Sequence, residues 1–220
     1  MTTGAAVFTA ASAVLVLAGA AHRRAAVALV KPIPMLILGA RVVHGLRRRR
    51  PVDTALLIGA VAFSMTGDRM MYAEEFASDP EVADRRLRDG ALAFTAAHLC
   101  YLTLARRRGG RVTRSGLLRR APVLIETSAV VAVRRPEILP VLSGYGPTLA
   151  SMSAMAATVP ACRPGGALFL VSDAVLINRR HLLRGRRARG AAEAVVLSTY
   201  CAAQWWLATG LDPACPGWSV

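Results

Sequence analysis

Long apolar segments separated by short clusters of arginine run through nearly the whole chain, and this pattern most limits the possible folds. Hydrophobic residues make up 54% of the 220 residues, and the mean hydropathy is +0.41. In a soluble domain, apolar residues recur with the period of a helix or a strand rather than in continuous blocks. A helix needs about 20 apolar residues to cross the ~30 Å hydrocarbon core of a bilayer. The pattern therefore predicts transmembrane helices.

About eight such helices are predicted, forming an all-α, polytopic membrane helix bundle with one transmembrane domain over residues 1–220. The approximate segments are 5–21, 25–44, 52–72, 90–105, 121–133, 138–159, 165–178 and 191–210. Backbone groups must find hydrogen-bond partners within the bilayer, and the segments are too long and continuous for barrel strands. Two charged stretches, 73–89 and 179–189, are predicted to be surface loops because they are too polar to be buried.

Two of the segments allow more than one interpretation. The first resembles a signal peptide, but basic residues follow it instead of preceding it, which favours a retained helix. The fifth is short of a full span at about 1.5 Å per residue, unless flanking arginines extend it by snorkelling to the two interfaces. These arginines, which are also possible partners for a structural Glu126, are Arg119, Arg120, Arg134 and Arg135.

The formal net charge of +15 raises the question of nucleic-acid binding, and the distribution of the charge argues against it. The arginines lie between apolar segments and form no basic face, as expected of residues that flank membrane spans. The expected location is a multi-pass position in the cell membrane of a bacterium, among membrane lipids and without a nucleic-acid partner. The uncharged start and basic end of the first segment favour an external N-terminus, and oligomeric state is not predicted.

Two aspartates, Asp68 and Asp173, lie inside apolar segments, where a charged side chain costs on the order of 3 kcal/mol. Each directly follows a small residue, in Phe-Ser-Met-Thr-Gly-Asp and Phe-Leu-Val-Ser-Asp. Small residues let helices approach closely, which brings an acid on one helix near a partner on another. Charged residues in such positions usually face the protein interior and serve a function, so both aspartates are candidate functional residues.

Chain direction brings further polar residues toward the membrane face nearest the two aspartates. The third and seventh segments run in one direction and the second runs in the other. Lys31, the only lysine among 28 basic residues, and Asn178 therefore lean toward this face. The fourth and eighth segments enter from the same face with two pairs of residues that each share one side of a helix, His98 with Tyr101 and Tyr200 with Gln204.

If these helices are neighbours, a polar cavity containing both aspartates opens to that face. The alternative is that the polar residues only join helices, through hydrogen bonds and one buried Lys–Asp pair.

The order of these residues along the chain resembles the YhhN family of membrane proteins, the lysoplasmalogenase group. The matching motifs are Lys31-Pro32, Phe63-Ser64 with Gly67-Asp68, Phe94 with His98 and Tyr101, Tyr145 and Met152, Gly166-Ala167 and Phe169 with Ser172-Asp173, and Tyr200 with Ala203-Gln204. The family usually continues after Gly-Asp with aliphatic residues, whereas Arg69 follows here. Stretch 179–189 is also unusually basic. Both departures lie at the expected mouth of the cavity and concern the substrate more than the reaction.

The resemblance implies hydrolysis of the vinyl ether of a lysoplasmalogen, a lysophospholipid, to a fatty aldehyde and a glycerophospho-amine. Such a reaction needs an acid that protonates carbon and a carboxylate that activates water, and two carboxyls in unlike environments divide these roles. Asp68 and Asp173 are the predicted pair, and Lys31 tunes one of them or meets the lipid phosphate. The predicted substrate-binding or orienting residues are Lys31, His98, Tyr101, Tyr145, Asn178, Tyr200 and Gln204. Neither a metal nor a cofactor is predicted.

Two other functions are compatible with the same residues. A proton-coupled transporter would use the intramembrane acids, lysine and histidine as a relay. Transporters often contain matching halves and broken helices, and the third and seventh segments are weakly alike, while Gly144 and Pro147 interrupt the sixth. A non-catalytic lipid-binding membrane protein is the second alternative.

Overall fold

Each predicted apolar segment contains a helix in the computed structural model, which describes residues 3–214. The α-helices are α1 (Thr3–Ala20), α2 (Arg24–Val30), α3 (Pro32–His44), α4 (Pro51–Glu75), α5 (Pro80–Arg107), α6 (Arg114–Leu118), α7 (Ala121–Arg134), α8 (Leu139–Ala156), α9 (Arg163–His181) and α10 (Arg186–Gly210). Short 3-10 turns are η1 (Leu46–Arg48), η2 (Pro136–Ile138) and η3 (Pro160–Cys162). No strand occurs in this part of the chain, so the all-α prediction is confirmed.

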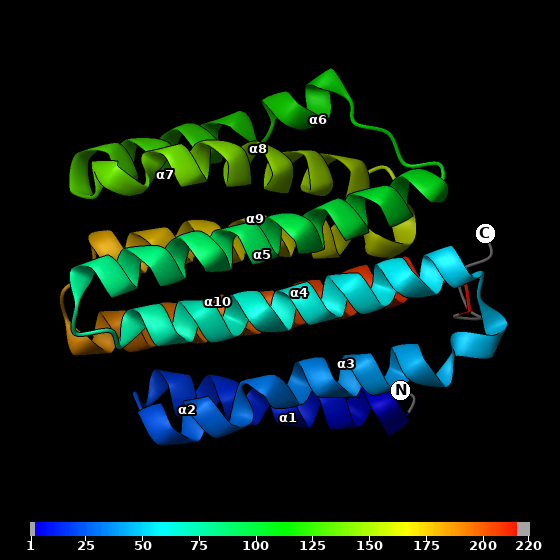
Figure 1. The fold of residues 1–220 in the computed structure, drawn as a ribbon, viewed down its shortest axis with the longest axis horizontal. Helices are drawn as coiled ribbons and strands as arrows, with labels where there is room; N and C mark the ends of the chain where they lie inside the picture. Colours follow the sequence, from blue (N-terminus) through cyan, green and yellow to red (C-terminus); the bar gives the residue numbers. More distant parts are fainter. Residues whose placement is uncertain (1–2, 215–220) are drawn as a thin grey trace.

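The long helices lie side by side and alternate in direction, with α4, α5, α9 and α10 in the middle (Figure 1). α4 packs along α5, and α9 packs along α10. The first three helices cover one side of this group, and α6, α7 and α8 cover the other (Figure 1). Polar residues on the inward faces of the four central helices are therefore enclosed by neighbouring helices.

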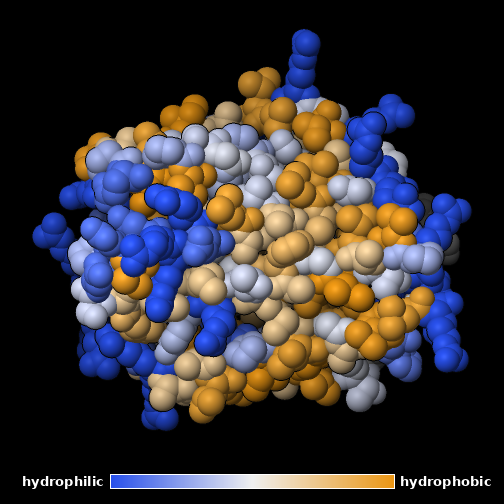
Figure 2. All heavy atoms as spheres, viewed as in Figure 1, coloured by the Kyte–Doolittle hydropathy of each residue, from blue (hydrophilic) through white to orange (hydrophobic). Residues whose placement is uncertain are grey.

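Three helical stretches in the described part of the chain are long and apolar enough to cross a membrane, namely Thr3–Ala20, Arg24–His44 and Pro160–His181. The total of about eight membrane spans stays a prediction. The surface has an apolar central zone between two ends rich in charged residues (Figure 2). Large apolar side chains are exposed to the surroundings, among them Leu29, Ile125 and Val133 at 75%, 68% and 78%. An apolar belt of this kind is what hydrocarbon chains would cover.

The second apolar segment is interrupted at Lys31, where α2 ends and α3 begins. Pro32 is the first residue of α3. A proline lacks the N–H that would continue the helix, and its ring obstructs the carbonyl of the preceding turn. The interruption places Lys31 at a junction between two helices that face α4.

The charged stretches predicted as loops are mostly helical, so that prediction is wrong. α4 continues to Glu75 and α5 begins at Pro80, while α9 continues to His181 and α10 begins at Arg186. Asp79 caps α5 by accepting a hydrogen bond from the Glu81 N–H at 2.9 Å. Pro80 fits the first turn, where a backbone N–H has no helical partner in any case.

Many of these charged residues are tolerated inside the bundle because they pair with one another. The ion-pair cluster at this end consists of Glu74, Glu75, Asp84, Arg135, Glu137, Arg179, Arg180 and Glu193. Glu74 is 8% exposed and lies 3.1 Å from Arg135 and 2.5 Å from Arg180. Arg179 is 4% exposed and lies 3.0 Å from Glu75 and 2.9 Å from Glu193. Sequence composition alone suggested exposure because it does not reveal such pairing.

The same pairing sets the charge state of Glu75 at the end of α4. Burial on its own would raise the pKa of the Glu75 carboxyl, but the hydrogen bond from Arg179 and the charges of Arg179 and Arg180 lower it below its ordinary value. The carboxylate therefore stays ionised at neutral pH and keeps α4 joined to α9.

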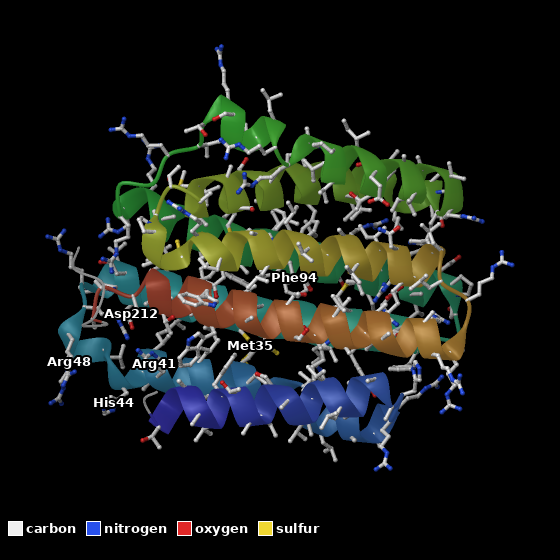
Figure 3. All side chains as sticks on the ribbon, turned by 180° about the vertical axis from the view of Figure 1, so that it is seen from behind. Met35, Arg41, His44, Arg48, Phe94 and Asp212 are labelled. Atoms are coloured by element: carbon white, nitrogen blue, oxygen red, sulfur yellow. The ribbon has the colours of Figure 1, made fainter. Side chains whose placement is uncertain are left out.

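A second buried ion pair closes the opposite end of the bundle. Arg49 donates to both oxygens of Asp212, at 2.5 and 2.6 Å, and to the Val42 carbonyl at 2.5 Å. The two charged side chains are 1% and 5% exposed. Asp212 lies at the same end as Arg48 (Figure 3), so this pair joins the turn after α3 to the chain after α10.

The fifth predicted segment is the short helix α7, and two of its four flanking arginines have partners within the protein. Arg120 donates to the Ser153 side chain at 2.8 Å and to its carbonyl at 2.7 Å, and Arg135 belongs to the ion-pair cluster. Glu126 is exposed and forms no ion pair with any residue of 3–214. The predicted pairing of Glu126 is therefore wrong, because the nearby arginines have other partners or lie beyond its reach.

Candidate active site

Asp68, in α4, contacts side chains from two other parts of the bundle. The Lys31 Nζ lies 3.5 Å from one carboxylate oxygen, and the Tyr200 hydroxyl of α10 donates to the other at 2.6 Å. The Lys31 and Asp68 side chains are only 20% and 13% exposed. The lysine that was expected to meet one of the two aspartates thus pairs with Asp68, which has a cation and a phenol as partners.

A cavity of about 310 Å³ lies beside Asp68, between the α2–α3 junction and α4. This volume is at the lower end of the ~300–1,000 Å³ range of small-molecule sites. Lys31, Asp68 and Arg69 supply charged groups to its lining, and Met35 and Met65 supply apolar surface. The cavity therefore combines features that suit an amphiphilic ligand.

Asp173, in α9, has a different environment. The Tyr145 hydroxyl of α8 donates a hydrogen bond to its carboxyl group, and the His98 Nε2 of α5 lies 3.3 Å from the same hydroxyl. No ion pair to Asp173 exists within residues 3–214. Cavities of about 80 and 30 Å³ adjoin it, and the larger one extends to Arg135 and Arg180 of the ion-pair cluster.

Aromatic rings separate the two aspartates, and we call Phe94, His98 and Phe169 the aromatic wall. The Phe94 centroid lies 6.2 Å from that of Tyr200, the partner of Asp68, and the Phe169 ring lies 5.6 Å from Tyr200 and 4.6 Å from His98. Phe94 lies near the middle of the bundle (Figure 3) and lines the larger cavity beside Asp173.

The aspartates consequently line different cavities, and the prediction of one shared cavity is wrong for this conformation. Chain direction gives the level of a residue along the bundle. It does not reveal that large rings from α5 and α9 fill the space between two residues at similar levels.

A third set of polar residues lies deeper in the bundle than Asp68 and joins α4, α5 and α10. Tyr101 of α5 donates to the Gln204 Oε1 at 2.7 Å, and the Gln204 Nε2 donates to the Ser64 hydroxyl at 3.0 Å. All three residues are 0% exposed. Ser64 lies one helical turn from Asp68 in α4, and Gln204 lies one turn from Tyr200 in α10. This chain of hydrogen bonds therefore fixes the rotation of the two helices about their axes, and that rotation pairs Asp68 with Tyr200.

Asn178 is the one predicted site residue that joins none of the polar groups around Asp68, Asp173 and Gln204. Its side-chain amide donates to the Ala174 carbonyl of its own helix at 3.0 Å. Ser64 and the Phe169 ring, in contrast, were not predicted as site residues. Ser64 lies four residues before Asp68, on the same side of α4, and this spacing is the signal that would have found it.

Gly67 provides the space that the Phe94 ring occupies, and an added methyl group would displace the ring. A Cβ at this position would lie 2.6 Å from the Phe94 Cδ2. We expect Gly67→Ala to destabilise the protein by about 1–3 kcal/mol, the usual effect of overpacking, and to move the ring from its place between the aspartates. Unfolding of the purified protein in mixed detergent micelles measures the first effect.

The matched control is Gly39→Ala in α3, where the nearest atom to an added Cβ is a Val61 methyl at 3.7 Å. This change should be neutral or stabilising by up to ~1 kcal/mol, because alanine favours a helix more than glycine does. Equal stability of the two variants would contradict the close contact between Gly67 and Phe94.

No group of three or more His, Cys, Asp and Glu side chains is placed to hold a metal ion in the part of the chain that the structure describes. The site itself supplies carboxyl groups, phenols, an imidazole and an ammonium group. The two carboxyls differ in charge environment, since a cation contacts Asp68 and none contacts Asp173 among the described residues.

Comparison with known proteins identifies the family of the chain. No curated protein and no solved structure matches the chain. The model of the YhhN family matches residues 26–211, from within α2 to the residue that follows α10. The matched region includes both aspartates, their tyrosine partners and Lys31. The chain belongs to the YhhN family.

Proposed function

We propose that this protein is a multi-pass membrane hydrolase that cleaves the vinyl ether bond of a lysoplasmalogen or a related lysolipid. The products are a fatty aldehyde and a glycerophospho-amine. Family membership suggests a lysoplasmalogenase-like membrane protein. The observation that carries the proposal is a pair of half-buried carboxyl groups with unlike partners. Lys31 and Tyr200 hold one of them, and among the described residues Tyr145 is the partner of the other.

The reaction consists of three balanced steps. An acid gives its proton to the vinyl carbon that is not bonded to oxygen. The positive charge is then shared by the ether oxygen and the inner carbon, which is the carbon bonded to it. Water adds to the inner carbon and gives a proton to a carboxylate, which leaves a hemiacetal. As the carbon–oxygen bond to glycerol breaks, the carboxyl group that took the proton from water gives it to the glycerol oxygen, and the acid regains its proton from the hemiacetal hydroxyl. One water is consumed, and no oxidant or reductant is needed.

The environments of the two aspartates suggest which group has which role. A buried carboxylate is favoured by a nearby positive charge, and Lys31 supplies that charge to Asp68. We therefore assign Asp68 as the carboxylate that accepts a proton from water and stabilises the oxocarbenium ion. Asp173 has no cation partner among the described residues and is assigned as the acid. Dividing roles by environment follows the logic of paired carboxyls in glycoside hydrolysis.

Both groups reach one substrate only if the aromatic wall opens. Phe94 is half-buried and lines the cavity beside Asp173, so its ring has neighbouring space to move into. In our proposal the substrate enters from the cavity beside Asp68, and its planar vinyl ether takes the place of the displaced ring. Rotamer changes of this kind are common when ligands bind.

The direct test uses purified protein in detergent with matched lysophospholipids that carry a vinyl ether, an ester or a saturated ether at the first glycerol carbon. We expect aldehyde from the vinyl ether alone, because only this group gives a stabilised cation on protonation of carbon. Release of fatty acid from the ester alone would overturn the assignment. Uptake of a solute by proteoliposomes with no lipid turnover would favour the transporter instead.

A further inference from the structure

Arg69 directly follows Asp68 in α4, and its side chain lines the same cavity as Lys31. It is exposed, and it makes no ion pair, hydrogen bond or ring contact with any residue of 3–214. Three other arginines toward this end differ, since Arg179 and Arg180 pair with glutamates and Arg24 lies over the Phe76 ring. A guanidinium with five N–H donors and no protein acceptor is therefore available to a ligand in this cavity.

Lys31 adds a second cation to the same cavity. Its ammonium group has three N–H donors, and one carboxylate oxygen of Asp68 at 3.5 Å is its ion-pair partner. The two cations and one carboxylate leave a single net positive charge on the lining. A phosphodiester carries one negative charge, so it matches this lining, whereas the carboxylate of Asp68 opposes a more highly charged anion.

The lining also changes from polar to apolar with depth. Tyr72 lies toward the charged end, where its hydroxyl contacts the Arg24 carbonyl at 3.3 Å. Met35 lies one turn inward from Lys31, and Met65 lies one turn inward from Arg69. An anionic group at the outer end and an aliphatic chain at the inner end would each meet suitable surface.

We propose that Arg69 and Lys31 bind the phosphodiester of a lysophospholipid in this cavity and that Arg69 makes the protein prefer phosphate-bearing lipids over phosphate-free ones. This inference rests on the proposed function, because it names the part of the substrate that this site recognises. Arginine donates two parallel hydrogen bonds to a phosphate, which gives both affinity and orientation. The bound phosphate fixes the distance between the headgroup and the ether bond that Asp68 acts on.

Binding, not turnover, provides the test, so its result is interpretable even if hydrolysis is absent. The probes are a saturated alkyl-ether lysophosphoethanolamine, which has no vinyl ether to cleave, and the corresponding alkylglycerol without phosphate. We expect Arg69→Gln to weaken binding of the phospholipid by about 10- to 100-fold, the usual loss for a hydrogen bond to a charged group, and to leave alkylglycerol binding unchanged. Arg69→Lys should be intermediate, because it keeps the charge and loses the paired hydrogen bonds.

The matched control is Arg187→Gln, which removes an exposed, unpartnered arginine of α10 outside this cavity and should not alter either affinity. Equal loss of both ligands in Arg69→Gln, or no loss of either, would overturn the proposal. Inorganic phosphate as a competitor distinguishes a site for a lipid headgroup from a site for free phosphate. If phosphate displaces the lipid when the two are present at similar concentrations, the cavity is a free-phosphate site, which would contradict recognition of a lipid.

Discussion

Replacing Asp68 or Asp173 with asparagine is expected to lower kcat/KM for vinyl ether hydrolysis by about 10²- to 10⁴-fold, the usual contribution of a positioned acid or base. Asparagine has the same shape and can still accept the hydrogen bond from Tyr200 or Tyr145. It can neither deliver a proton to carbon nor take one from water. Release of aldehyde by the purified variants in detergent measures the effect.

Asp53→Asn is the matched control, because it removes a carboxylate from the same helix as Asp68 but near its opposite end. Asp53 pairs with Arg107 at 2.5 Å and lines none of the three cavities beside the two aspartates. This variant should keep full activity. If Asp68→Asn and Asp173→Asn insert normally, bind the saturated ether lipid and still release aldehyde, the two aspartates are not the acid and the base.

The helix content and the level of the site residues could be predicted because both depend on short-range sequence patterns. Apolar blocks locate helices, and alternating direction correctly brought Lys31 to the level of Asp68. A spacing of four also placed Tyr200 and Gln204 on one side of α10, where they meet Asp68 and Ser64. These features follow from the geometry of a single helix and the order of the helices along the chain.

The errors arose where distant parts of the chain meet. Glu74 reads as a surface residue until Arg135 and Arg180 from two other helices are placed around it. The separation of the aspartates depends on how the Phe94 and Phe169 rings pack, which is a property of tertiary contacts. Sequence patterns predicted which residues lie at one level of the bundle, and side-chain volume decides which of them share a cavity.

Replacing Asp212 with alanine is expected to destabilise the protein by about 3–5 kcal/mol, because it leaves the buried Arg49 guanidinium without its carboxylate. The Arg49 side chain is 1% exposed and would keep only the Val42 carbonyl among its present hydrogen-bond acceptors. Unfolding by sodium dodecyl sulfate in mixed micelles gives the free energy of unfolding. The aspartates of the candidate site lie elsewhere in the bundle, so activity at low temperature should persist.

The control is Glu81→Ala, which breaks an exposed pair with Arg85 at 3.7 Å and should change stability by no more than about 0.5 kcal/mol. A double replacement, Arg49→Leu with Asp212→Leu, distinguishes the free-energy cost of an unpaired charge from the loss of the Arg49–Asp212 contact itself. It should recover much of the stability lost in Asp212→Ala, because apolar side chains of similar size can replace a buried ion pair. If Asp212→Ala is as mild as Glu81→Ala, Arg49 reaches water after the change, and the pair does not close this end of the bundle. Full loss in the double variant would instead show that the two-point Arg49–Asp212 contact itself joins the turn after α3 to the end of α10.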